Sequence, residues 1–164
     1  MPRNSLADKN CSLARALDIV GEWWSLLVIR DAFFGSRRFQ DFADNLGIAR
    51  NILSARLKKL VAAGVLARIE TEKGTVEYRL TPRGEALQPV LVSLMQWGDT
   101  HANPLPKPVL LVDKAEGRPL APMEIRAADG RILGIKDVRA VPGPGADPSL
   151  IARLGKRRRT AAVS

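Results

Sequence analysis

Residues 49–60 have the side-chain types and spacing of a surface that binds nucleic acid. At 100° per residue, Asn51, Ser54, Ala55 and Lys58 share one side of a helix, opposite a stripe of leucines. Amide side chains hydrogen-bond base edges, short side chains allow close approach to a groove, and lysines pair with phosphates. The pattern predicts a DNA-reading helix. The alternative is a polar face that is simply solvated.

Basic residues cluster around this predicted surface. The segment 35–60 contains six basic and two acidic residues. Two arginines precede a short helix whose free N–H groups favour phosphate, and a lysine at a hairpin tip could reach the adjacent minor groove or backbone. The predicted DNA-binding residues are Arg37, Arg38, Arg50, Asn51, Ser54, Ala55, Arg56, Lys58, Lys59 and Lys73.

The elements that position this surface follow from apolar periodicity. Helices are predicted from about residue 11 to 20, over 22–34, over 39–46 and over 48–63, and the second should be central because it is apolar on nearly all sides. Gly47 separates the last two by a tight turn, which is typical of a helix-turn-helix.

A predicted hairpin and a further helix complete this part of the chain. Alternating residues at 65–69 and 76–80 flank a Lys73-Gly74 turn. Thr81 is a predicted N-cap for a fifth helix that reaches about Trp97 and is kinked at Pro89. Three helices followed by a two-stranded wing predict a mainly α, α+β fold of the winged helix-turn-helix type.

Composition divides the 164 residues, whose net charge is +9, unevenly along the chain. All eight aromatic residues precede residue 98, whereas eight of the eleven prolines lie between residues 104 and 148. We therefore expect a domain at 1–103, a small β-rich C-terminal extension at 104–147 and a basic tail at 148–164 that is a short helix or mobile. Short strands are predicted at 109–112, 123–126 and 131–135.

The residues between Cys11 and Gly98 resemble a known family. The resemblance rests on the stretch Cys11–Asp31, then Arg38-Phe39, Gly47-Ile48, Leu53–Leu60, Glu77–Thr81 and Met95–Gly98. Together they are similar to the HxlR-type winged helix-turn-helix transcriptional regulators. The resemblance implies sequence-specific binding of double-stranded DNA by a homodimer, joined through its terminal helices, at a palindrome-like operator.

Apolar residues in the fifth predicted helix agree with such a dimer. They exceed what a small wing can cover, although completion of a monomer core is the alternative. The predicted interface residues are Leu13, Leu17, Leu87, Leu91, Leu94, Met95 and Trp97.

Cys11 is the single cysteine and aligns with a residue that some family members use as a thiol sensor. A helix N-terminus lowers a thiol pKa, which makes Cys11 a candidate redox sensor, and packing at a dimer interface is the alternative. Relatives with a similar extension often carry cysteine pairs that resemble a zinc ribbon, but the matching positions here lack thiols, so we expect no structural metal.

Other function classes receive little support from the sequence. Phosphate-loop, dinucleotide-binding, hydrolase and metalloprotease motifs are lacking, so we expect neither an enzyme nor a cofactor. The polar N-terminus and the lack of a long apolar stretch favour a soluble, cytoplasmic protein without a membrane partner. The alternative function is a ligand-sensing or protein-interaction module in which the C-terminal extension is the working part and specific DNA binding is lost. A small-molecule effector of unknown identity is a further candidate partner.

Overall fold

The computed structural model describes residues 5–102 and 106–161, without the side chains of 156–161. The chain divides into two compact units, one formed by residues 19–123 and the other by residues 1–18 together with 124–164. Helix α1, Ser12–Val20, crosses the boundary, and its last residue belongs to the core of the first unit.

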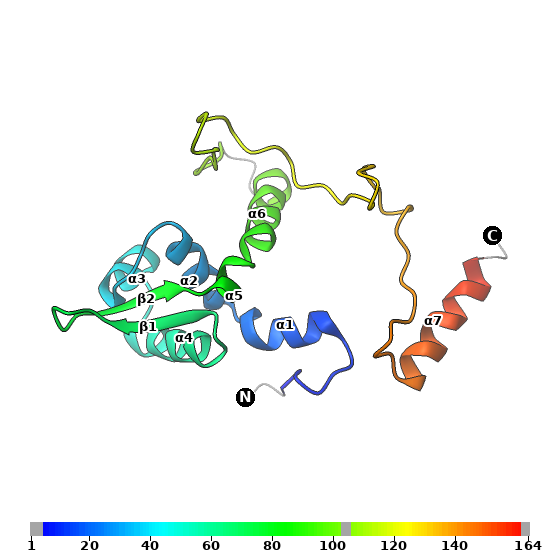
Figure 1. Ribbon diagram of the computed structural model, residues 1–164, viewed down its shortest axis with the longest axis horizontal. Helices are drawn as coiled ribbons and strands as arrows, with labels where there is room; N and C mark the ends of the chain where they lie inside the picture. Colours follow the sequence, from blue (N-terminus) through cyan, green and yellow to red (C-terminus); the bar gives the residue numbers. More distant parts are fainter. Residues whose placement is uncertain (1–4, 103–105, 162–164) are drawn as a thin grey trace. The chain divides into compact units, whose positions relative to one another are not determined.

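The unit 19–123 has the predicted order of helices followed by a hairpin. Its elements are α2 (Trp23–Phe33), α3 (Phe39–Leu46), α4 (Arg50–Ala62), β1 (Leu66–Glu70), β2 (Val76–Leu80), α5 (Pro82–Glu85), α6 (Gln88–Trp97) and a π-type turn (Gly98–Ala102). The strands pair antiparallel in register Leu66↔Leu80 to Glu70↔Val76, and the hairpin extends past α3 and α4 (Figure 1). The α+β fold class and the winged helix-turn-helix are confirmed.

The core of this unit explains why α2 is so apolar. Val28, Ile29 and Ala32 of α2 are fully buried, and α2 packs against α3, α4 and β2. Phe42 of α3 is also fully buried and meets Tyr78 of β2 edge-on, with ring centroids 6.5 Å apart. The same core therefore holds both the helix-turn-helix and the wing.

The tight turn between α3 and α4 forms as predicted. Gly47 ends α3 in the left-handed conformation with φ of 59°, where its N–H donates to the Ala43 carbonyl at 3.0 Å. A side chain at this φ would be strained, which explains the glycine. The turn fixes where α4 begins and hence the direction of its exposed side.

The prediction of a single, kinked fifth helix is wrong. The chain forms two helices, α5 and α6, instead of one from Thr81 to Trp97. Pro89 lies in the first turn of α6, where a missing N–H costs no helical hydrogen bond, so the helix restarts there instead of bending. The N-cap prediction is confirmed because Thr81 Oγ1 accepts from the Gly84 N–H at 3.1 Å.

The three strands predicted after residue 105 are also wrong. In the part of the chain that the structure describes, those segments form only isolated antiparallel bridges, Val112↔Pro119 and Arg126↔Ile132. An isolated two-stranded hairpin is only marginally stable, so short alternating segments need further strands to pair with. The first bridge closes a small hairpin that Gln96 of α6 holds, accepting from Met123 N at 2.7 Å and donating to the Ala121 carbonyl at 2.9 Å.

The second unit contains most of α1 and a C-terminal helix, α7, at Pro148–Ala161. Asp147 precedes α7 and accepts from Leu150 N at 2.8 Å and Ser149 Oγ at 2.9 Å. The hydrogen bond from Leu150 N, followed by those from Asn10 and Ser149, lowers the pKa of Asp147. The helical alternative for the basic tail therefore holds over residues 148–161.

Gly84 of α5 has no room for a side chain. A Cβ placed there would lie 2.2 Å from the Val65 carbonyl oxygen, which also accepts from Thr81 N at 3.2 Å. Backbone at the start of β1 would have to move, so we expect Gly84→Ala to lower the free energy of unfolding by about 1–3 kcal/mol. Urea denaturation measures this loss. Gly98→Ala meets open space, and a loss as large there would contradict the explanation.

Candidate nucleic-acid interface

Helix α4 presents one exposed side with the predicted composition. Asn51, Ser54, Ala55 and Lys58 are all exposed, and we call these four residues the α4 ridge. The leucines on the opposite side, Leu53, Leu57 and Leu60, are at most 1% exposed. Burial of that stripe against α2 and β1 fixes which side of α4 faces outward.

The first turn of α4 lacks a side-chain cap. Ala49 occupies the N-cap position with extended φ and ψ of −60° and 135°, and its methyl group accepts no hydrogen bond. The free N–H groups at this end of α4 lie next to the α4 ridge and are available to an anion.

Two predicted arginines are exposed near the start of α4. Arg50 Nη2 donates to Gln40 Oε1 at 2.6 Å, and its guanidinium lies 5.8 Å from the centroid of the Phe39 ring. Arg38, which precedes α3, is also exposed. Gln40 lies in the first turn of α3 and orients Arg50 through this hydrogen bond. The sequence did not predict this role, because no periodic pattern marks it.

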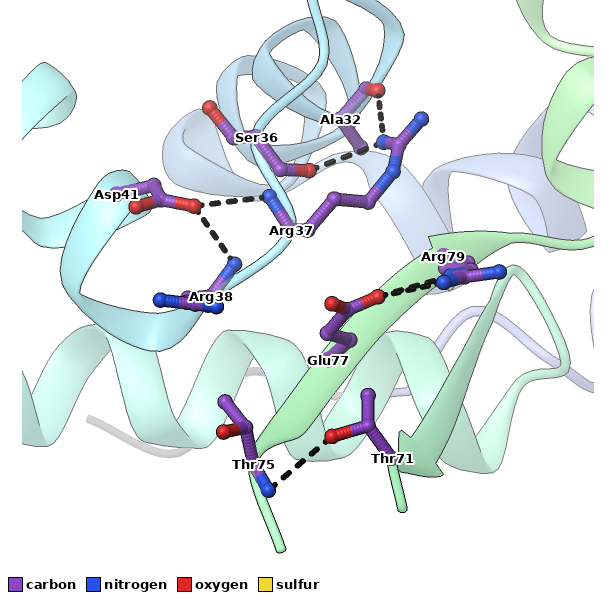
Figure 2. Close-up of polar contacts among 9 residues, drawn as sticks. All are labelled: Ala32, Ser36, Arg37, Arg38, Asp41, Thr71, Thr75, Glu77 and Arg79. Atoms are coloured by element: carbon purple, nitrogen blue, oxygen red, sulfur yellow. Dashed lines mark hydrogen bonds and ion pairs between the residues drawn. The ribbon is translucent and has the colours of Figure 1, made fainter. Parts of the chain in front are cut away.

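Arg37, in contrast, bonds to its own domain. Its Nη1 donates to the Ala32 carbonyl at 2.7 Å and to the Ser36 carbonyl at 3.0 Å (Figure 2). Its own carbonyl accepts from Tyr78 N of β2 at 2.7 Å. Arg37 therefore ties the loop before α3 to α2 and to the wing, and its side chain is half-buried.

Asp41 supports the same loop. Its Oδ2 accepts from the backbone N–H groups of Arg38 at 2.9 Å and Arg37 at 3.2 Å (Figure 2). These hydrogen bonds, the one from Arg38 first, lower the pKa of Asp41. The carboxylate is placed in the first turn of α3, where the helix dipole also favours negative charge.

Glu22 binds two of the predicted DNA-contacting cations. Its carboxylate forms an ion pair with Arg56 and lies 3.2 Å from Lys59 Nζ. The side chain of Arg56 is only 19% exposed, and that of Lys59 is 39% exposed. Glu22 lies 34 and 37 residues away in the sequence, so its approach could not be found from local spacing.

The wing presents Lys73 at its tip. Lys73 is exposed next to Gly74, whose φ of 70° makes the turn. Thr71 and Thr75 close the loop, because Thr71 N donates to the Thr75 carbonyl at 2.9 Å. Thr75 N also donates to Thr71 Oγ1 at 3.2 Å (Figure 2). Arg79 of β2 is paired with Glu77 at 2.8 Å, and Lys73 stays the predicted wing contact.

The predicted dimer residues separate into two groups. Leu91 lies in the core and Leu87 packs against it, which matches the alternative of completing a monomer core. Leu94 and Trp97 are 49% and 59% exposed, Met95 is half-buried, and Leu13 and Leu17 of α1 are exposed. An apolar surface on the last part of α6 is thus left uncovered within the protomer.

Three further expectations concern small molecules and thiols. Cys11 is exposed just before α1, and its role as a redox sensor stays a prediction. Within the described residues, no three His, Cys, Asp or Glu side chains group as metal ligands. A cavity of about 60 Å³ between α6 and residues 107–120 is smaller than typical ligand pockets, so the predicted effector gains no site from it.

Comparison with known proteins identifies the family of this chain. Residues 19–106 match the model of the HxlR-like helix-turn-helix family, which is more than half of the chain. The chain belongs to the HxlR-like family. It is a helix-turn-helix transcriptional regulator that binds DNA, and its resemblance to the HxlR-type regulators is confirmed.

Individual relatives of this HxlR-like chain agree with the assignment. The uncharacterised HTH-type regulator Mb3122 of Mycobacterium bovis is 42% identical over 137 residues, covering 82% of this chain and 87% of that protein. The crystal structure of PA1607, a candidate transcription factor, is 42% identical with a TM-score of 0.81, covering 85% and 99%. The redox regulator HypR in its reduced form is 26% identical with a TM-score of 0.52, covering 57% and 95%.

These relatives are named as regulators, not as enzymes. Throughout the described residues, no helix is both long and apolar enough to cross a membrane.

Proposed function

We propose that this HxlR-like regulator binds a palindrome-like operator as a homodimer and acts on its target DNA in the cytoplasm. Residues 1–103 form the DNA-binding and dimerisation domain in this proposal, with an extension at 104–147 and a basic tail at 148–164. The observation that carries the proposal is the α4 ridge, which is exposed, small at its centre and cationic at one end. A ridge of this kind fits between the backbones of a DNA major groove.

Each exposed residue of the proposed interface has a distinct role. Asn51 reads a base edge, Ser54 and Ala55 permit close approach, and Lys58 binds a phosphate. Arg38 and Arg50 bind phosphates beside the start of α4, and Lys73 reaches the neighbouring groove or backbone. Arg37, Arg56 and Lys59 are engaged within the protein, so we leave them out of the direct contacts.

Dimerisation supplies the second half-site. A single winged helix meets few base pairs, and a two-fold dimer places two reading helices about one DNA turn apart. The exposed residues Leu94 and Trp97, with Leu13 and Leu17, form the proposed contact between copies of the chain.

Substitution of Lys58 and of Asn51 tests the assignment of roles. We expect Lys58→Gln to weaken all duplexes alike and to reduce the dependence of log K on log salt by about 1.8, since each of the two protomers loses one phosphate contact. We expect Asn51→Ala to cost about 1–3 kcal/mol per half-site on the operator and little on random DNA, because a base contact is lost in each half-site. Fluorescence anisotropy over a salt series, with an operator selected from a random pool, measures both.

The control is Lys114→Gln on the extension hairpin, which removes the same charge away from α4. Equal effects of Lys58→Gln and Lys114→Gln would show that general charge, not the α4 ridge, governs binding. Selected DNA lacking two half-sites about one turn apart would contradict the proposed dimer.

A further inference from the structure

Glu22 makes an unusual contact for a residue at the start of a helix. It is the N-cap residue of α2, yet its side chain makes no hydrogen bond to α2. Its carboxylate instead binds Arg56 and Lys59 of α4, with Lys59 Nζ 3.2 Å from Oε1. A carboxylate that could interact with the dipole of its own helix therefore pairs with cations of α4 instead.

The two lysines of α4 differ in their surroundings, although they are adjacent in the sequence. Lys58 is exposed, and no hydrogen bond or ion pair is recorded for it among the described residues. Lys59 follows it at the edge of the α4 ridge, 39% exposed, and faces Glu22. A DNA phosphate that approaches Lys59 must compete with a carboxylate already in place and meets its repulsion.

Arg56 contributes little to the outer surface. It is mostly buried, and its guanidinium pairs with the same carboxylate. Once the charge of Glu22 is neutralised, Lys59 is the cation that gains access to solvent and DNA.

We propose that Glu22 is a specificity-determining residue that holds Lys59 away from DNA phosphates and so limits sequence-independent binding. This inference rests on the proposed DNA-binding function of the α4 ridge. Non-specific affinity is almost wholly electrostatic, so each cation withheld from phosphate lowers it while base contacts are unaffected.

The test compares single variants of the full chain on a fluorescein-labelled duplex of random sequence, across a salt series. We expect Lys59→Gln to leave the salt dependence as in the wild type and the affinity within about twofold, because Lys59 makes no phosphate contact. Lys58→Gln, the matched variant one residue away, should lower the salt dependence by about 1.8 and the affinity about 25- to 100-fold at 0.1 M salt, because both protomers of the proposed dimer lose one contact.

Removal of the carboxylate charge should act in the opposite direction. We expect Glu22→Gln to raise the salt dependence by about 1.8 and the random-sequence affinity about 25- to 100-fold, since each protomer gains one contact, and Glu22→Gln/Lys59→Gln to return both to the wild-type values. Glu116→Gln is the control, because it removes the same charge from a 3.2 Å ion pair with Arg118 on the extension. It should change the affinity less than twofold.

Two results would overturn the inference. One is a Lys59→Gln effect as large as that of Lys58→Gln, and the other is a Glu22→Gln effect no larger than that of Glu116→Gln. If Glu22→Gln fails to fold by thermal denaturation, the lysine pair alone decides. Wild-type binding without salt dependence would instead refute the proposed function itself, so the two failures are distinguishable.

Discussion

A Leu94→Glu/Trp97→Glu variant is expected to be monomeric and to bind the operator about 10²-fold or more weakly than the wild type. Both side chains are about half exposed in the protomer, so the domain core does not depend on them. Two carboxylates in an apolar contact between copies would be desolvated without partners. Loss of the dimer removes the linkage that lets a second half-site bind at high effective concentration.

Sedimentation equilibrium and anisotropy titration on the operator measure the two parts of this prediction. The control is Ile135→Glu/Val138→Glu, which adds the same charge at exposed apolar positions outside the proposed interface. It should remain dimeric and lose little affinity. A dimer of Leu94→Glu/Trp97→Glu with full operator affinity would place the contact between copies on another surface.

The largest loss of stability is expected for Phe42→Ala. Phe42 is fully buried at the centre of the core and meets Tyr78 of the wing edge-on. Removal of its ring leaves a cavity and an aromatic pair without its partner, which should cost about 3–5 kcal/mol of the free energy of unfolding. That is about a fifth or more of the stability of a typical domain, which is about 5–15 kcal/mol.

Urea denaturation at one fixed protein concentration measures the loss as a lower midpoint, since the proposed dimer would make stability depend on concentration. Phe34→Ala is the matched control: Phe34 is 50% exposed, so the same substitution should cost about 1 kcal/mol or less. Similar losses at the two positions would mean that Phe42 does not hold the wing on the helix-turn-helix.

Local patterns predicted most of the elements that carry the candidate interface. The 3.6-residue repeat of leucines in α4 requires Leu53, Leu57 and Leu60 to face the core, and the polar side then faces outward. Gly47 and Thr81 mark element boundaries because their backbone and hydroxyl chemistry acts over a few residues. Determinants that act over a few residues, such as these, can be found from the sequence alone.

Elements without a strong local determinant were predicted less well. The segments after residue 105 alternate in polarity, but a strand needs a partner that supplies backbone hydrogen bonds, and the described chain offers only single bridges. Pro89 was compatible with either a kink or a new helix start. The packing of α5 on β2 and of Leu91 in the core decided for the second.

The sequence by itself determined the winged helix-turn-helix, the exposed polar side of α4 and the family, because these depend on periodicity, turn chemistry and motif order. Only the tertiary structure decided which cations are free. Glu22 meets Arg56 and Lys59, and Arg37 meets the end of α2, through contacts made when separate helices pack together. The same packing buried Leu91 and left Leu94 exposed, although both belong to one apolar helix. Contacts between residues that are distant in the sequence leave no periodic pattern in it, so the sequence could not distinguish these two leucines.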